Sequence, residues 1–333
     1  MFVALLVIGL ITAFVTVPID TRTMPADPHP LADYASAVSE YNAGIERDRA
    51  GVMADGGSLI YVHGTSTPRA IVLIHGLTNS PRQFRELAQQ LYDRGDNVIV
   101  PRLPLHGLVA ADVGALREVT AERYRAYADS AVDVARGLGD TVLVVGLSAG
   151  GNVAAWIAQH RGDVARVVVI APAITLARIP RLLAAPAMNV MERAPNLTLH
   201  QTPDTLRAHA YFGVSTRGLG ETLRLGAMVL EDADREPPVV RDITLVINDN
   251  DRTISEGSAL TLMARWKARA GITTRLHRFD RALRLPHDVI DVSQRCGVPA
   301  IVYPVIIALI EGQTPAAQGV VAAPCADSLA APR

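Results

Sequence analysis

The chain has 333 residues, of which 49% are hydrophobic, and its 32 lysines and arginines nearly balance 33 aspartates and glutamates. A chain of this length and apolar content can bury a large core. The net charge of −1 gives no electrostatic reason to expect nucleic-acid binding. The sequence contains no phosphate-binding glycine loop, no dinucleotide fingerprint and no cysteine–histidine metal spacing, so we expect neither a nucleotide cofactor nor a metal.

The first feature along the chain is an uncharged apolar stretch, Phe2–Val17. Extended to residues 1–19, it just reaches the roughly 17 to 20 residues that a membrane span requires. No basic region precedes it and no clear cleavage site follows it, which favours an anchor over a cleaved signal peptide, and a helix of the globular core comes third. We therefore expect a membrane-anchored protein whose main domain lies on the exported, periplasmic or extracellular side, or a secreted protein if the segment is cleaved.

The next elements are an extension and a buried strand. Residues 20–54 are expected to form a partly helical N-terminal extension. The β-branched apolar run Arg69–Ile74 then predicts a buried strand, which ends in His75, Gly76 and Leu77 and is followed by a helix. A turn of this kind can direct a backbone N–H, here that of Leu77, at a developing negative charge. We interpret His75 and Gly76 as supporting residues, with His75 bracing the loop.

A second strand-like run, Thr141–Val145, leads into a Gly-Leu-Ser-Ala-Gly motif and then into helical spacing. The motif alone is common by chance, but the order strand, G-x-S-x-G, helix is typical of a nucleophile elbow. Such a sharp turn exposes the hydroxyl of Ser148 and requires small residues at Gly146 and Gly150. It also leaves the N–H of Ala149 beside that hydroxyl, at the positive end of a helix. Ser148 is therefore the candidate nucleophile, and Ala149 is a candidate oxyanion donor.

Strand–helix alternation stops between Ala171 and about Pro238. Apolar residues at helical spacing, separated by prolines and Gly213, predict short amphipathic helices there. An insertion at about residues 172–238 would overhang Ser148. Many of its apolar side chains must pack the insertion onto the sheet, and the others could contact a hydrophobic ligand.

A serine nucleophile requires a base and a group that orients the base. The predicted strand Asp242–Ile247 is followed by two candidate acids, Asp249 and Asp251. The candidate base is His287, because it lies in a loop after the last predicted strand. His277 lies within that strand and is interpreted as a half-buried structural residue.

The serine, acid and histidine in this order, with the His75-Gly76 turn, resemble the α/β-hydrolase family, close to bacterial carboxylesterases and monoacylglycerol-lipase-like serine hydrolases. The resemblance covers roughly residues 55–312. It implies a mostly parallel central sheet flanked by helices, with a helical cap insertion over the active site. The acid loop usual in the family, Gly-x-x-Asp-x-x-Val, favours Asp251 over Asp249. A departure is Leu105, which stands where relatives often carry a glycine before a His-Gly pair.

The resemblance implies a serine hydrolase that cleaves carboxylic esters with a hydrophobic or lipid-like acyl group through an acyl-enzyme. The same triad would serve a thioesterase or an acyltransferase. A catalytically silent, membrane-bound binding protein is a further alternative, which the complete set of triad residues disfavours.

The two cysteines lie on either side of the last predicted helix, Pro299–Ile310. In an exported chain Cys296 and Cys325 could form a disulfide that ties down the Ala/Pro-rich tail at residues 313–333. The alternative is a pair of unrelated thiols.

Overall fold

The fold is built on one central sheet. The computed structural model describes residue 9 and residues 12–108, 113–200 and 209–316. Seven strands lie in the order β1-β3-β2-β4-β5-β8-β9, and all pairs are parallel except the antiparallel pair β1–β3. The strands are β1 Leu59–Tyr61, β2 Thr67–Ile74, β3 Asn97–Val100, β4 Gly139–Leu147, β5 Arg166–Ile170, β8 Asp242–Asn248 and β9 Thr273–Phe279. This sheet, flanked by helices, confirms the predicted fold class.

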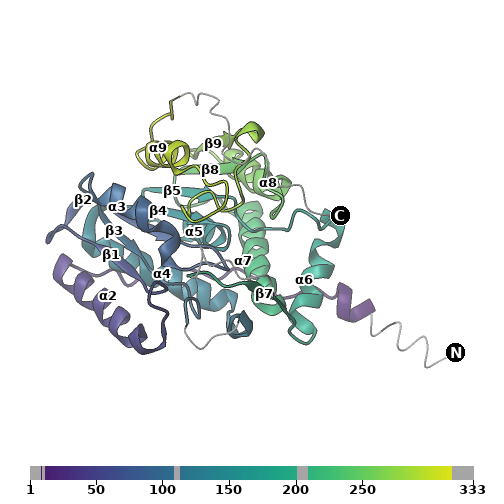
Figure 1. The fold of residues 1–333 in the computed structure, drawn as a ribbon. Coiled ribbons are helices and arrows are strands. Elements are labelled where there is room, and N and C mark those ends of the chain that lie inside the picture. Colours follow the sequence, from purple (N-terminus) through teal and green to yellow (C-terminus); the bar gives the residue numbers. More distant parts are fainter. Residues whose placement is uncertain (1–8, 10–11, 109–112, 201–208, 317–333) are drawn as a thin grey trace.

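Both faces of the sheet are buried. In β2 the side chains of Ala70, Val72 and Ile74 join one apolar cluster, and those of Ile71 and Leu73 join the other, as the twofold period of a strand requires. Helices α2, α4, α5, α7 and α8 supply the first cluster, and α3 and α9 supply the second (Figure 1). The helices outside the insertion are α2 Tyr34–Asp48, α3 Arg85–Tyr92, α4 Ala121–Leu138, α5 Ala149–His160, α8 Glu256–Lys267 and α9 Pro299–Ile310.

Short 3₁₀ turns precede or follow several of the helices and strands. They are η1 Arg49–Gly51, η2 Pro81–Phe84, η3 Val113–Glu118, η4 Arg181–Leu183 and η6 Arg281–Leu283. The turn η2 opens with Pro81, which lacks an N–H and suits a first turn, so α3 itself begins only at Arg85.

The insertion between β5 and β8 forms the cap, which contains η4, α6 (Ala184–Arg193), the antiparallel pair β6 (Thr198–His200) and β7 (Gly213–Ser215), and α7 (Thr216–Arg235). Figure 1 shows α6, α7 and β7 grouped beside the sheet. The expectation of short helices alone is wrong here, because α7 has 20 residues and a strand pair intervenes. Three-residue strands are too short to give a periodic signal, and Pro186 lies in the first turn of α6, where proline is tolerated.

One side chain of α5 hydrogen-bonds to the cap, in addition to the apolar packing of α7 in the main core. The Nδ2 atom of Asn152, on α5, donates to the carbonyl oxygens of Ala173 at 2.9 Å and Thr222 at 2.8 Å. Gly226 permits this close approach, since a Cβ at that position would lie 2.9 Å from the same Nδ2. The cap is therefore held to the helix that carries the candidate nucleophile.

The N-terminal apolar segment is described only in part. Residues 12–16 are helical, and the side chains of Phe14 and Val17 are 40% and 52% exposed. Asn189 and Arg193 of α6 donate to carbonyl oxygens of this segment. No helix within the described residues is long and apolar enough to cross a membrane. Most of the predicted anchor (residues 1–8, 10 and 11) and Cys325 lie outside the described residues, so the anchor and the disulfide stay predictions.

Candidate active site

Ser148 lies at a tight junction between β4 and α5. Its backbone has φ 59° and ψ −114°, a conformation that is strained for a residue with a side chain. A Cβ at Gly146 would lie 2.0 Å from the carbonyl oxygen of Gly150, and a Cβ at Gly150 would lie 2.1 Å from that of Ile74. Both positions therefore require glycine, and the strain at Ser148 is held by backbone packing on each side.

Two backbone N–H groups lie near Ser148. Ala149 is the first residue of α5, so its N–H has no acceptor within the helix. The turn after β2 lies alongside, because a Cβ at Gly76 would be 3.6 Å from the Cβ of Ser148. In the described part of the chain no hydrogen bond occupies the N–H of Leu77 or of Ala149. Both groups are thus available to an oxyanion.

The loops after β8 and β9 bring Asp251 and His287 together. The Nδ1 atom of His287 lies 2.6 Å from Oδ2 of Asp251, whose Oδ1 accepts the N–H of Thr253 at 2.8 Å. The carboxylate is 4% exposed and the imidazole 19%. The Nε2 atom of His287 is buried and has no hydrogen-bond partner among the described residues. An imidazole oriented through Nδ1 with Nε2 unoccupied is the arrangement that a general base needs.

The other candidate acid, Asp249, has a different partner. The carboxylate of Asp249 pairs with Arg278 on the surface, which in turn pairs with Glu256. The structure thus brings Asp251, and not Asp249, to His287. His277 lies on β9 beside the ring of Phe279, at 4.8 Å between ring centroids, and burial lowers its pKa.

One cavity contains both reactive side chains. It has a volume of about 650 Å³, within the range of small-molecule sites. Ser148 and His287 line it together with Gly76 and Leu77 of the neighbouring turn. Apolar side chains from the cap supply much of the remaining wall, namely Ile179, Leu199, Ala210, Val214 and Leu219. A hydrophobic ester could therefore reach the serine under the cap.

His75 supports the turn after β2 through two hydrogen bonds. Its Nδ1–H donates to the carbonyl oxygen of Gly76 at 2.9 Å, and its Nε2 accepts the N–H of Leu103 at 3.0 Å. Burial lowers the pKa of His75 well below its usual value, which keeps the ring neutral in this arrangement. His106 is also fully buried, with a pKa lowered by burial to about 4, and it does not line the cavity. Leu105 has φ 66°, a left-handed conformation that explains why glycine suits this position.

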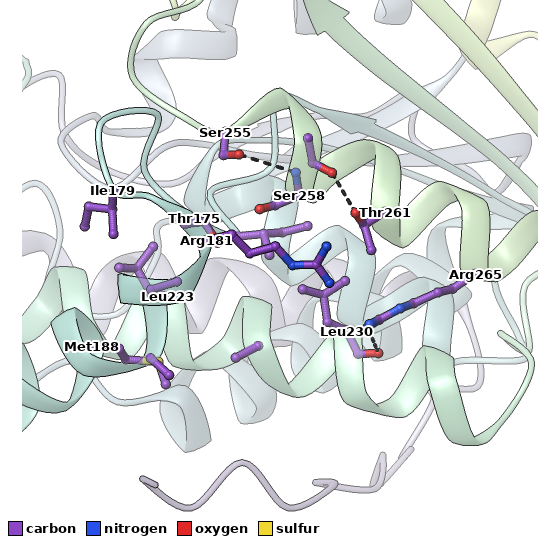
Figure 2. Close-up of a pocket in the computed structure, with 15 residues that line it drawn as sticks. Thr175, Ile179, Arg181, Met188, Leu223, Leu230, Ser255, Ser258, Thr261 and Arg265 are labelled. Carbon is purple, nitrogen blue, oxygen red and sulfur yellow. Dashed lines mark hydrogen bonds between the residues drawn. The ribbon is translucent and has the colours of Figure 1, made fainter. Parts of the chain in front are cut away.

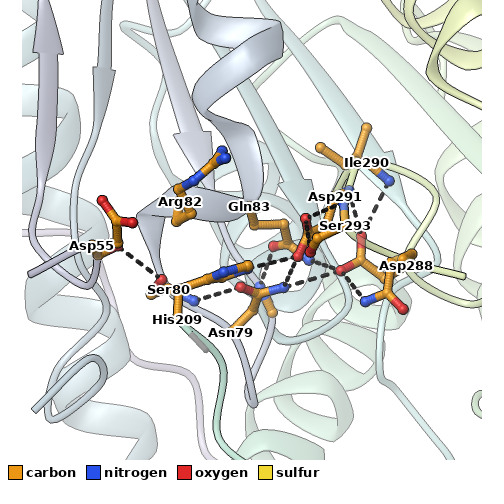
Figure 3. A network of polar contacts seen from close by, with 12 residues as sticks. Asp55, Asn79, Ser80, Arg82, Gln83, His209, Asp288, Ile290, Asp291 and Ser293 are labelled. Atoms are coloured by element: carbon orange, nitrogen blue, oxygen red, sulfur yellow. Dashed lines mark hydrogen bonds and ion pairs between the residues drawn. The ribbon is translucent and has the colours of Figure 1, made fainter. Parts of the chain in front are cut away.

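A buried polar network behind the site was not foreseen from the sequence (Figure 3). Gln83 accepts the N–H of Gly76 at 2.9 Å and donates to Asp288 at 2.7 Å, next to the candidate base. Asp288 also accepts from Asn79 and Gln294. The network thereby joins the oxyanion turn to the His287 loop. No local pattern marks these residues, because they come from turns that only the tertiary fold brings together.

The cap joins the same network through one histidine. His209 Nε2 lies 2.8 Å from Oδ2 of Asp291, and both side chains are buried. Asn79 donates to the same carboxylate oxygen at 3.3 Å. Because Asp291 lies four residues after His287, this contact fixes the cap relative to the base loop.

A second cavity of about 370 Å³ lies between the cap and α8 (Figure 2). Ile179 lines both this cavity and the one that contains Ser148. Arg181 extends among the lining residues, which also include Met188 and Leu223 of the cap helices (Figure 2). This cavity contains none of the candidate catalytic residues.

Comparison with known proteins agrees with the geometry. A family model described as the alpha/beta hydrolase family matches residues 71–293, about two thirds of the chain. The chain belongs to the alpha/beta hydrolase family. A thermostable monoacylglycerol lipase from Bacillus sp. (strain H-257) is 27% identical to it over 208 residues, which cover 58% of this chain and 74% of that relative.

Solved structures of lipolytic enzymes share the fold of this α/β-hydrolase. One, of the metagenome-derived lipolytic enzymes LipS and LipT, has a TM-score of 0.58 at 17% identity and covers 79% of this chain and 100% of its own. A soluble variant of monoglyceride lipase from Saccharomyces cerevisiae has a TM-score of 0.53 at 13% identity, covering 77% of this chain and 90% of its own. At these identities the likeness concerns the fold alone.

Proposed function

We propose that this α/β-hydrolase is a serine hydrolase that cleaves carboxylic esters with a hydrophobic or lipid-like acyl group. The observation that carries the proposal is the 2.6 Å contact between Asp251 and His287. The Nε2 atom of His287 has no hydrogen-bond partner among the described residues, and His287 lines one cavity with Ser148. The similarity to a monoacylglycerol lipase supports ester hydrolysis in general. The apolar lining supplied by the cap supports a hydrophobic substrate.

In the first half of the reaction, Ser148 Oγ attacks the ester carbonyl carbon while Nε2 of His287 takes the hydroxyl proton. Asp251 orients the ring and stabilises the imidazolium. The N–H groups of Leu77 and Ala149 donate to the oxyanion. When the tetrahedral intermediate collapses, the ester C–O bond breaks and His287 gives the proton to the leaving alcohol.

In the second half, water replaces the alcohol. His287 takes a proton from the water as its oxygen attacks the acyl-enzyme, and returns that proton to Ser148 when the acid leaves. No cofactor takes part in these steps. The strained elbow contributes by holding the serine in the attacking position before substrate arrives.

The experiment is hydrolysis of p-nitrophenyl esters of increasing chain length by the wild type and by Ser148→Ala. We expect turnover that favours longer, apolar acyl groups, and a loss in the variant of about 10⁴-fold or more, because no other serine and no cysteine is among the described residues that line the cavity. A variant that keeps substantial activity with an unchanged melting temperature would overturn the assignment of Ser148.

We also propose that residues 1–19 attach the protein to a membrane, with the catalytic domain on the exported side. The support is the uncharged apolar run Phe2–Val17. The full chain should stay with the membrane fraction in high salt, since ions do not screen hydrophobic insertion. A chain lacking residues 1–24 should be soluble and active. Full-length protein that high salt releases would contradict this attachment.

A further inference from the structure

Two arginines lie at the mouth of the proposed ester-hydrolase site. Arg178 is on the loop that leads from β5 into the cap, and Arg252 directly follows Asp251 on the loop after β8. Both line the cavity that contains Ser148 and His287, and both are exposed at its edge. Their charges therefore face the space through which a substrate enters or leaves.

Backbone pairing brings the two segments that carry the arginines side by side. Leu176 and Ile254 form an antiparallel bridge, and the N–H of Ala177 donates to the carbonyl oxygen of Thr253 at 3.1 Å. Arg178 and Arg252 each lie two residues from the bridged pair, beyond Ala177 and Thr253. Arg178 lies in a turn closed by a hydrogen bond from the N–H of Ile179 to the carbonyl oxygen of Leu176 at 3.2 Å. All four side chains, those of Leu176, Ile254 and the two arginines, line the cavity.

No carboxylate of the described residues neutralises these two arginines. Neither arginine side chain forms an ion pair or a hydrogen bond with any residue in the described ranges, whereas Arg278 nearby pairs with both Asp249 and Glu256. The closest acids are already engaged, because Asp251 binds His287 and Asp288 accepts three side-chain amides. Two like charges that line one cavity repel each other, so an anion bound by both would be favourable.

We propose that the physiological ester carries an anionic group, a carboxylate or a phosphate, which Arg178 and Arg252 bind at the cavity mouth. The planar guanidinium fork donates two hydrogen bonds at once to either anion, so a pair of them recognises this chemistry better than two point charges would. The apolar wall formed by Ile179, Leu199 and Leu219 would hold the hydrophobic remainder. The proposal rests on the ester hydrolase function and defines its substrate class as an amphiphilic anionic ester.

Two matched substrate pairs test which anion is preferred. The carboxylate arm compares mono-p-nitrophenyl adipate with its neutral methyl ester. The phosphate arm compares 1-myristoylglycerol 3-phosphate with 1-myristoylglycerol, below their critical micelle concentrations. For each pair the readout is the selectivity, defined as kcat/KM for the anionic ester divided by kcat/KM for the neutral one. Because both members share the scissile acyl linkage, the selectivity isolates the contribution of the anion.

The variants are Arg178→Gln, Arg252→Gln and the double substitution. Arg123→Gln is the control, since Arg123 is also exposed and its side chain has no partner in the described part of the chain, but it lies on α4 away from the cavity. We expect the wild-type selectivity in at least one arm to fall about threefold in each single variant and about tenfold in the double variant, as for exposed ion pairs. The control should keep it unchanged. High salt should also lower the wild-type selectivity.

The outcomes separate this inference from the function on which it rests. Equal changes for the anionic and neutral esters in the double variant, or no wild-type preference in either arm, would overturn the anion site while Ser148-dependent hydrolysis upheld the enzyme. Hydrolysis of none of the four esters would overturn both. If the double variant fails to fold, each single variant with a normal melting curve still provides the test.

Discussion

The edge of the sheet at Ser148 and the cap above it differ strongly in how far their packing tolerates substitutions. At the elbow, a single added methyl group would lie 2.0 Å or 2.1 Å from a carbonyl oxygen. On the cap, Leu182 and Leu183 are 91% and 54% exposed, and Leu197, just before β6, and Leu199, within it, are 60% and 58% exposed. The packing around the candidate nucleophile thus allows no larger residue, whereas the surface of the cap, which also lines the cavity, can accept substitutions.

The comparison extends to how the two regions are held in place. At the elbow, backbone packing on each side holds Ser148 at a strained φ angle. The cap is held by the buried apolar face of α7 and by polar contacts of Asn152 with the carbonyl oxygen of Thr222 and of His209 with Asp291, while its outer surface is exposed. Substitutions near the elbow should therefore affect turnover and folding strongly, and substitutions on the cap surface should affect mainly selectivity.

The largest expected effect is a loss of turnover when the acid that orients His287 is replaced. Asp251→Asn should lower kcat by about 10⁴-fold, the loss known for the equivalent change in a serine protease, because the imidazole loses its correct tautomer and its stabilising charge. The matched control is Asp249→Asn, which removes only a surface pair with Arg278 and should lower kcat less than twofold. Steady-state kinetics on a short p-nitrophenyl ester measures both, and the reverse ranking would assign the acid role to Asp249.

The packing of the elbow can be tested through stability. Gly150→Ala should lower the free energy of unfolding by about 3 kcal/mol or more, because its methyl group would overlap the backbone at Ile74. Gly162→Ala is the control, since its Cβ would lie 4.0 Å from the nearest atom, on Val239. Urea denaturation gives both values, and equal stability of the two variants would show that the elbow can relax.

The network behind the site connects the two regions and should have an intermediate effect. Asp288→Asn replaces an acceptor with an amide that faces the donors of Gln83, Asn79 and Gln294, so we expect a loss of about 2 kcal/mol in unfolding free energy. Asp280→Asn is the control, because asparagine caps the Ala282 N–H as well as aspartate does. A thermal melt distinguishes them. An Asp288 variant as stable as the control would mean that the network is dispensable.

The smallest effect is expected on the outer surface of the cap. Leu182→Ala should change the unfolding free energy by less than about 0.5 kcal/mol, since the side chain is 91% exposed. Leu225→Ala, at a fully buried position of α7, should lower it by about 2 to 5 kcal/mol. If the exposed leucine proved as important for unfolding as the buried one, the surface of the cap would not be the tolerant region described here.

The sequence predicted the elbow at Ser148 better than it predicted the cap. Strand β4 and the G-x-S-x-G turn form a local pattern whose geometry follows from the residues themselves, and the order of Ser148, Asp251 and His287 indicated the fold. The strand pair in the cap escaped prediction because three residues carry no period. The Gln83–Asp288 contact and the bridge that brings Arg178 and Arg252 to one cavity escaped as well, because each joins segments distant in sequence.

The most direct test of the central claim is covalent labelling of the purified protein with a fluorophosphonate probe, followed by mass spectrometry of its peptides. An activated serine displaces fluoride and retains the phosphonyl group, whereas an unactivated hydroxyl does not react. We predict one adduct per chain, on Ser148, that forms much more slowly in Asp251→Asn and is absent from Ser148→Ala. Folded wild-type protein that acquires no adduct, or acquires it on another residue, would contradict the account.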